Sequence, residues 1–175
     1  MKRNLILALA FVTALPTLAM SQSKNNLVGT WKLVSVVSKT DKGGVNSTVF
    51  GANPKGFITY NSEGRMSVVI AYDGRKPLSV NDALAAPVEE RAQAFATAIA
   101  YAGTYTFTGD KVVHHVEVAL NPNLVNTDLT RRVKIEGDRV ILSTPPISHG
   151  GVMQTYELTW ERLKPSGPKA HTTDR

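Results

Sequence analysis

The chain has 175 residues, with 20 lysines and arginines against 14 acidic residues, a formal net charge of +6 and no cysteine. This length fits one domain, and the lack of cysteine excludes disulfides, thiolate metal ligands and a cysteine nucleophile. A nucleic-acid-binding face would need clustered basic residues with stacking aromatic side chains. Only Arg131, Arg132 and Lys134 come near such a cluster, and they alternate across a predicted strand. The sequence therefore predicts no nucleic-acid partner.

The N-terminus has the layout of a secretory signal peptide. Lys2 and Arg3 precede an apolar stretch over residues 5–15, and small residues follow near Ala19. This layout predicts a signal peptide over residues 1–21, which is too short for a spanning helix. An uncleaved N-terminal anchor is the alternative, and the absence of cysteine excludes a lipid-modified export signal. We therefore expect a periplasmic or secreted protein with no integral membrane segment after signal cleavage.

Short β-branched runs separated by turn residues follow the leader. The first strand is predicted over residues 27–37. The next two, over residues 56–60 and 65–72, form a hairpin whose turn ends in a glycine, the residue that such loops use for positive φ. Strict alternation along this hairpin points Tyr60 and Met66 inward.

A helix is predicted over residues 87–102. Pro87 suits the first helical position, and the acidic residues that follow it favour the positive end of the helix dipole. Gly103 is predicted to end the helix. Apolar residues recur at helical spacing, and we expect this stripe to face the core, with a lid over the mouth of a barrel as the alternative. The stripe consists of Val88, Ala92, Phe95 and Ile99.

Residues 103–120 carry the clearest hairpin signal, because two alternating runs meet at Gly109-Asp110. A turn there places Tyr105 opposite His114 on the apolar face, and His115 on the polar face. The two histidines therefore cannot chelate one ion together, and we predict no metal site. His114 is either a core histidine bonded to the Tyr105 hydroxyl or a ligand contact, and burial should lower its pKa. The predicted inward face comprises Tyr105, Phe107, Val112, His114, Val116 and Val118.

The remaining chain predicts a third hairpin and a last strand. The strands cover residues 129–135, 139–144 and 154–163, and we expect the tail over residues 164–175 to be disordered. An antiparallel meander has two exposed edges unless it closes. The sequence therefore predicts an all-β fold, a closed antiparallel up-and-down barrel of about eight to ten strands with one inserted helix. The interior of such a barrel is either filled by side chains or holds one small ligand.

The third hairpin points one basic residue inward. Its turn pairs Ile135 with Val140, which places Arg131 on the apolar face. Across the preceding loop, an even pairing puts Glu117 beside Arg132 on the polar face. A buried guanidinium needs an anionic or strongly polar partner, and no carboxylate lies on the predicted inward face. A ligand carboxylate or backbone carbonyls are the candidate partners.

Several segments together carry a family resemblance. Gly29-Thr30-Trp31 resembles the G-x-W signature of the lipocalins, and Arg162 matches the basic residue that packs over that tryptophan and closes one barrel end. The chain over residues 27–163 is similar to the bacterial and fungal lipocalin-like domain family, on the segments LVGTWKLVS, NPKGFITYNSEGRMSV, AYAGTYTF, HHVEVALNPN, RRVKIEGDRVILSTPP and LTWERL. The resemblance implies a barrel with a central cavity and structural roles for Trp31 and Arg162, and it transfers no catalytic residues. Leu124 departs from the family, which has an aromatic residue there.

These features predict a protein that binds a small hydrophobic or amphipathic molecule, with a carboxylate or carbonyl end, in the barrel cavity. The predicted ligand-binding residues are Arg131, His114, Tyr105, Tyr156, Tyr60 and Met66. A cofactor-free isomerase, cyclase or hydrolase is one alternative, because a His–Tyr–Arg group would supply acid–base help. However, the sequence shows no Ser-His-Asp arrangement and no paired inward carboxylates. A packed structural or interaction barrel is the other alternative. No cofactor is predicted, and the oligomeric state is left open.

Overall fold

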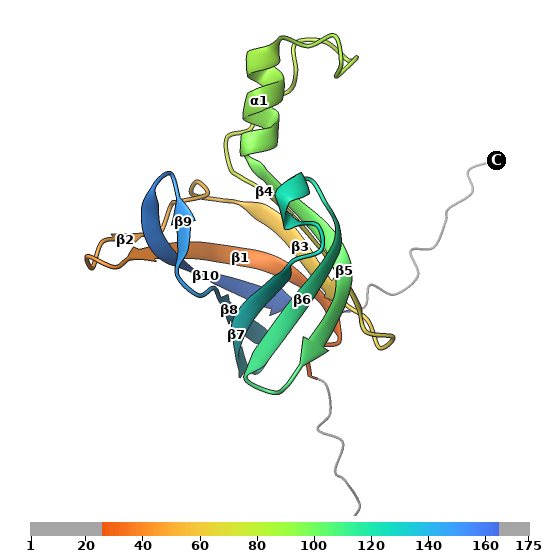
Figure 1. The fold of residues 1–175 in the computed structure, drawn as a ribbon, viewed down its shortest axis with the longest axis vertical. Coiled ribbons are helices and arrows are strands. Elements are labelled where there is room, and N and C mark those ends of the chain that lie inside the picture. The colour runs from red at the N-terminus through yellow and green to blue at the C-terminus, as the bar shows by residue number, and fades with distance from the viewer. Residues whose placement is uncertain (1–25, 165–175) are drawn as a thin grey trace, which may run out of the picture.

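The computed structural model describes residues 26–164, so the predicted signal peptide and all but the first residue of the predicted tail lie outside the described residues. The chain forms one antiparallel sheet in the order β2-β1-β3-β4-β5-β6-β7-β8-β10-β9. The pairing of β1 with β10 closes eight of these strands into a barrel, and α1 projects from one end of it (Figure 1). This confirms the predicted fold class. No helix among the described residues is long and apolar enough to cross a membrane.

Eight strands form the closed barrel, and two short ones extend its edges. The barrel strands are β1 Gly29–Thr40, β3 Lys55–Tyr60, β4 Arg65–Ala71, β5 Ala98–Phe107, β6 Lys111–Ala119, β7 Asp128–Glu136, β8 Arg139–Ser143 and β10 Val152–Arg162. The short strands are β2 Val45–Asn46 and β9 Ile147–His149. The helical elements are α1 Val88–Ala96 and a 3-10 turn, η1 Pro122–Leu124.

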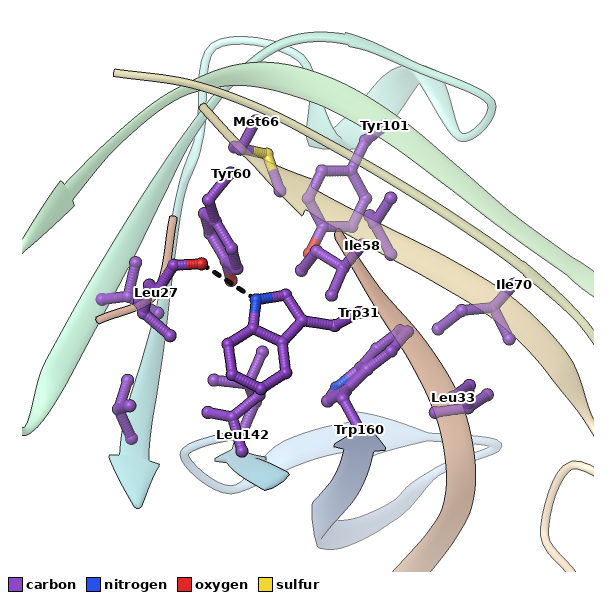
Figure 2. Packing of buried hydrophobic residues seen from close by; sticks show 14 of the residues in the cluster. Leu27, Trp31, Leu33, Ile58, Tyr60, Met66, Ile70, Tyr101, Leu142 and Trp160 are labelled. Carbon is purple, nitrogen blue, oxygen red and sulfur yellow. Dashed lines mark hydrogen bonds between the residues drawn. The ribbon is translucent and has the colours of Figure 1, made fainter. Parts of the chain in front are cut away.

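Inward side chains from all eight barrel strands form one core, because alternation brings every second residue of a strand to the same face. Around Trp31, the side chains of Trp160, Leu142, Tyr60 and Ile58 pack closely (Figure 2). The two ends of the barrel carry different loops. We call the end with the first residues of β1 and the β3–β4 turn the Trp31 end, and the end that carries α1 the α1 end.

The Trp31 end is closed by one arginine and one tryptophan. The Arg162 guanidinium carbon lies 3.9 Å from the centroid of the Trp31 ring, a cation–π contact. Arg162 also donates to the Val28 carbonyl at 2.7 Å, and Trp31 Nε1 donates to the Leu27 carbonyl at 2.9 Å. Gly29 has a φ of +136°, and a Cβ there would lie 2.6 Å from Arg162 Nη1. The arrangement explains why glycine, tryptophan and arginine occur together.

The predicted helix is too long. Helix α1 ends at Ala96, and β5 begins at Ala98 and pairs along its length with β4. Gly103 therefore lies inside a strand, where an added Cβ would meet the His115 carbonyl oxygen. The expected core-facing stripe is also wrong for the helix, because no residue of α1 is buried; Val88 is 63% exposed and Phe95 49% exposed. Ile99 does pack against the core, but from β5. Long-range pairing with β4 outweighs the local helical preference of the alanine-rich segment.

Two register predictions are also wrong. A bulge between β5 and β6 lies at Glu117, because Ala102 pairs with Val118 but Gly103 pairs with Val116. Val118 therefore turns outward and is 61% exposed, contrary to its predicted inward position. Glu117 pairs with Arg65 at 2.8 Å and not with Arg132.

Strands β6 and β7 pair six residues away from the predicted register, with Val112 opposite Arg131. A shift by an even number of residues keeps each side chain on the same face of the sheet. Arg131 accordingly remains on the inward face, opposite the fully buried Val112. The predicted pairs Tyr105–His114 and Ile135–Val140 are confirmed.

Candidate functional site

His114 on β6 is the centre of a buried polar cluster. The imidazole is 1% exposed, and each ring nitrogen faces one tyrosine. The Tyr60 hydroxyl lies 2.8 Å from Nε2, and the Tyr101 hydroxyl lies 2.9 Å from Nδ1. Burial, followed by the positive charges of Arg131 and His115, lowers the pKa of His114 to about 3. The imidazole is therefore neutral at physiological pH.

The two tyrosines come from strands on one side of His114, β3 for Tyr60 and β5 for Tyr101. Burial raises the pKa of both hydroxyls, and the nearby Arg131 guanidinium opposes part of the rise. Both hydroxyls therefore stay protonated. The Tyr60 ring also packs edge-on against Tyr105, with 4.9 Å between ring centroids. Packing thus fixes the Tyr60 ring beside the imidazole.

Arg131 on β7 brings a positive charge to this cluster. Its side chain is partly buried, and its Nη1 donates to the carbonyl of the preceding Thr130 at 2.7 Å. None of the ion pairs among residues 26–164 includes Arg131. Its charge influences the pKa values of Tyr60, Tyr101 and His114. A guanidinium in this position is not neutralised by any carboxylate of the described chain.

Tyr105 has a different partner from the one predicted. Its hydroxyl donates to the Asn61 carbonyl at 2.9 Å and does not bond His114. Tyr101 takes that place, and the sequence reasoning missed it because residues 87–102 were assigned to a helix. The alternation of Ile99, Tyr101, Tyr105 and Phe107, interrupted by glycine at position 103, was the signal that the strand begins earlier.

The other predicted site residues lie elsewhere in the interior. Met66 is buried opposite Tyr60 in the β3–β4 pairing and packs in the core. Tyr156 on β10 is buried, and its hydroxyl has no hydrogen-bond partner in the described structure. Its ring packs beside His149 and Phe50 toward the α1 end, with ring centroids 6.1 and 5.9 Å apart. Tyr156 and the His114 cluster are therefore separate polar positions inside one barrel.

Two cavities lie near the α1 end. One, of about 320 Å³, lies between the ends of β1, β2, β9 and β10 and adjoins Tyr156 through Gln154 and Ser38. Its lining comprises Ser38, Thr40, Gly44, Val45, Asn46, His149, Val152 and Gln154. The other, of about 450 Å³, lies between α1 and residues 73–78. His114, Arg131 and Tyr105 line neither of these cavities.

Residues 28–163 match the family described as a lipocalin-like domain. The chain belongs to the lipocalin-like domain family. This lipocalin-like protein is 34% identical over 101 residues to the 4'-hydroxy-3'-methoxypropiophenone carrier protein ppsC of Aspergillus oryzae. The aligned region covers 53% of this chain and 86% of that protein.

Two solved structures resemble this lipocalin-like protein in fold. A lipocalin-like protein from Bacteroides uniformis aligns with a TM-score of 0.39 and 13% identity, over 78% of this chain and 98% of its own. An uncharacterized protein from Bacteroides eggerthii aligns with a TM-score of 0.40 and 11% identity, over 79% of this chain and 100% of its own.

The second histidine of this lipocalin-like protein lies on the outer face of the barrel, as predicted. His115 Nδ1 lies 2.7 Å from Asp128 Oδ1, and its Nε2 lies 3.0 Å from the Thr106 hydroxyl. The order hydroxyl, imidazole, carboxylate resembles a hydrolytic triad, but Thr106 and Asp128 are exposed and His115 is partly exposed, on adjacent strands of the outer face. Backbone amides of paired strands are engaged in the sheet, so this face offers no oxyanion hole. We therefore interpret these contacts as surface interactions between neighbouring strands and not as a catalytic triad.

Proposed function

We propose that this lipocalin-like protein binds one small amphipathic molecule inside its barrel, with a polar oxygen of the molecule facing Arg131. The observation that carries the proposal is the inward Arg131 guanidinium, which has no carboxylate partner in the described chain. Arg131 has only neutral hydrogen-bond partners, the Thr130 carbonyl and the Tyr101 hydroxyl, and a partly buried positive charge without a counter-charge is unfavourable. An acidic or carbonyl oxygen of a ligand would supply the missing interaction.

The lining of the interior supports the same proposal. Ligand sites are mostly apolar, with a few polar groups that orient the ligand. Ser38 and His114 are the polar or charged residues among the buried positions of the described chain, and the others are apolar or aromatic. Tyr60, Tyr101 and Arg131 add the remaining polar atoms of the cluster. An amphipathic molecule matches this combination.

The relative from Aspergillus oryzae suggests a suitable ligand class. Its name makes it a carrier of 4'-hydroxy-3'-methoxypropiophenone, an aryl ketone with a phenol group. Such a molecule has a flat apolar ring and oxygen atoms at both ends. We propose that aryl ketones and phenols of this kind are the ligands of the present barrel.

The α1 end is the proposed entrance. The stack of Arg162 on Trp31 blocks the Trp31 end. Buried side chains, Tyr60 and Trp160 among them, pack around Trp31 (Figure 2). The cavity beside Ser38 and Gln154, at about 320 Å³, falls at the lower limit of common ligand sites. We propose that a ligand enters there and reaches the polar cluster as the inward side chains adjust.

Binding fits the geometry of His114 better than acid–base catalysis does. A general base needs a nitrogen that reaches the substrate proton and a pKa near the working pH. Both ring nitrogens of His114 already face tyrosine hydroxyls, and its pKa is lowered to about 3. We therefore propose a binding role for the cluster.

A titration with 4'-hydroxy-3'-methoxypropiophenone tests the proposal. Quenching of tryptophan fluorescence or calorimetry would give the Kd for the wild type, Arg131→Met and Arg132→Met. Hydrogen bonds to charged groups contribute about 1.5–3 kcal/mol, so we expect Arg131→Met to weaken binding roughly 10- to 150-fold. Arg132→Met is the matched control, because its side chain lies exposed on the outer face of the same strand. No saturable binding, or equal weakening by both substitutions, would refute the proposal.

Export is a separate proposal. The basic residues Lys2 and Arg3 and the apolar stretch over residues 5–15 support cleavage of a signal peptide. Expression in a Gram-negative host, followed by mass spectrometry of the periplasmic fraction, should recover a chain that lacks about the first 21 residues. Recovery of the intact chain in the cytoplasm would contradict export.

A further inference from the structure

We infer that the interior binds its ligand as an oxygen anion, the phenolate form of an acyl phenol, because the donor hydrogens around His114 outnumber the acceptors that the described chain offers them. This inference rests on the proposed function. It concerns the ionisation state that the barrel selects, and it follows from counting donors and acceptors around one imidazole.

The count begins with His114. A neutral imidazole has one N–H donor and one acceptor nitrogen. One of the two tyrosine hydroxyls therefore donates to the ring, and the other accepts from it and keeps its own hydrogen free. Neither Tyr60 nor Tyr101 has a second acceptor among residues 26–164. Whichever tautomer is present, one hydroxyl hydrogen of the pair lacks an acceptor.

Other groups in the interior add donors, and the acceptors among them are neutral hydroxyl oxygens. The Arg131 guanidinium has five N–H groups, of which the structure engages one with the Thr130 carbonyl and another with the Tyr101 hydroxyl. The Tyr156 hydroxyl hydrogen and the Trp160 Nε1–H also lack partners in the described chain. No aspartate or glutamate is among the buried residues of the described chain. The interior is therefore rich in donors and carries one positive charge.

A neutral phenol would bring another donor into this environment. Its phenolate brings only acceptor lone pairs and a negative charge beside Arg131, so it satisfies both the free hydroxyl hydrogen and the guanidinium. The titratable groups that face this position are His114 from β6, Tyr60 from β3, Tyr101 and Tyr105 from β5, and Arg131 itself. The imidazole is neutral and the hydroxyls of Tyr60 and Tyr101 are protonated near neutral pH, so a titration there would report the ligand.

Absorption spectroscopy distinguishes the two forms of the ligand, because a phenolate absorbs at longer wavelength than its phenol. We would titrate 4'-hydroxy-3'-methoxypropiophenone with pH, free and in the presence of saturating protein. The bound ligand is expected to ionise at least one pH unit below the free ligand, which corresponds to a tenfold or greater preference for the phenolate. The 4'-O-methyl ether, which cannot ionise, should bind at least tenfold more weakly.

Three substitutions sharpen the test. Arg131→Met should abolish the shift in ionisation, and the exposed Arg132→Met should retain it. Tyr101→Phe removes one hydroxyl of the pair but still leaves one hydrogen without an acceptor, on the imidazole or on Tyr60, so the shift should largely persist in this variant. Equal affinity for the phenol and its ether, with unchanged ionisation of the bound phenol, would overturn this inference and leave the proposed function standing. Failure of both compounds to bind would overturn both.

Discussion

Tyr101→Phe tests whether the hydrogen bonds around His114 stabilise the barrel. The substitution keeps the buried ring and removes the hydroxyl that lies 2.9 Å from His114 Nδ1. Because the imidazole is 1% exposed, water cannot easily replace that partner. Leaving a buried polar atom without a partner costs about 1–3 kcal/mol. For a domain of this size, about 2 kcal/mol corresponds to a decrease in Tm of roughly 4–8 °C.

Urea unfolding followed by circular dichroism would measure this loss. Tyr72→Phe is the matched control, because the Tyr72 ring is half-buried and stacks on Phe50, but its hydroxyl has no hydrogen bond within residues 26–164. We expect the control to change the free energy of unfolding by less than about 0.5 kcal/mol. Equal unfolding midpoints for wild type and Tyr101→Phe would refute the reasoning, and with it the hydrogen-bond count around the imidazole.

Further expectations concern pH and the two ends of the barrel. The folded-state pKa of His114 lies below its unfolded value of 6.5, so the unfolded chain binds more protons between about pH 3 and 6.5. Stability should fall by about 1.4 kcal/mol per pH unit as pH decreases through that window, and His114→Gln should remove this contribution in urea unfolding at several pH values. Gly103→Ala should destabilise by roughly 1–3 kcal/mol or more, since its Cβ would strike the His115 carbonyl oxygen; an unchanged Tm would contradict the bulge geometry. Arg162→Leu should lower stability by about 1–3 kcal/mol in urea unfolding, through loss of the Trp31 contact and of the bond to a backbone carbonyl.

The sequence predicted those features of the fold that depend on local information. Alternation identified the strands, and Gly109, with a φ of +94°, fixed the turn that sets Tyr105 opposite His114. The G-x-W motif and Arg162 predicted the closure of one end, which the structure confirms. In each of these cases, neighbouring residues or one short turn decide the geometry.

Features set by distant strands were harder to predict. Residues 97–102 suit a helix as well as a strand, and their pairing with β4 decides for the strand. The error hid Tyr101, and the His114 hydroxyl partner was therefore assigned to Tyr105. The register between β6 and β7 depends on the bulge at Glu117 and on the turn η1, and neither has a simple signature in one sequence. The sequence could predict only that the register error would be an even number of residues. An even shift keeps every side chain on its face of the sheet, so it was sufficient to place Arg131 inward.

Arg162 and Arg131 both point inward, but their contacts differ. We assign a structural role to Arg162 and propose a ligand-binding role for Arg131. Arg162 stacks on Trp31 and donates to the Val28 carbonyl, which belongs to the segment entering β1. Its interactions join the first and last strands of the barrel, so they account for its position without a ligand. Arg131 donates to the carbonyl of its own neighbour Thr130 and hydrogen-bonds the Tyr101 hydroxyl, both neutral groups, and it lowers the pKa of the central histidine. Its position therefore lacks a counter-charge, which the anionic ligand proposed above would supply.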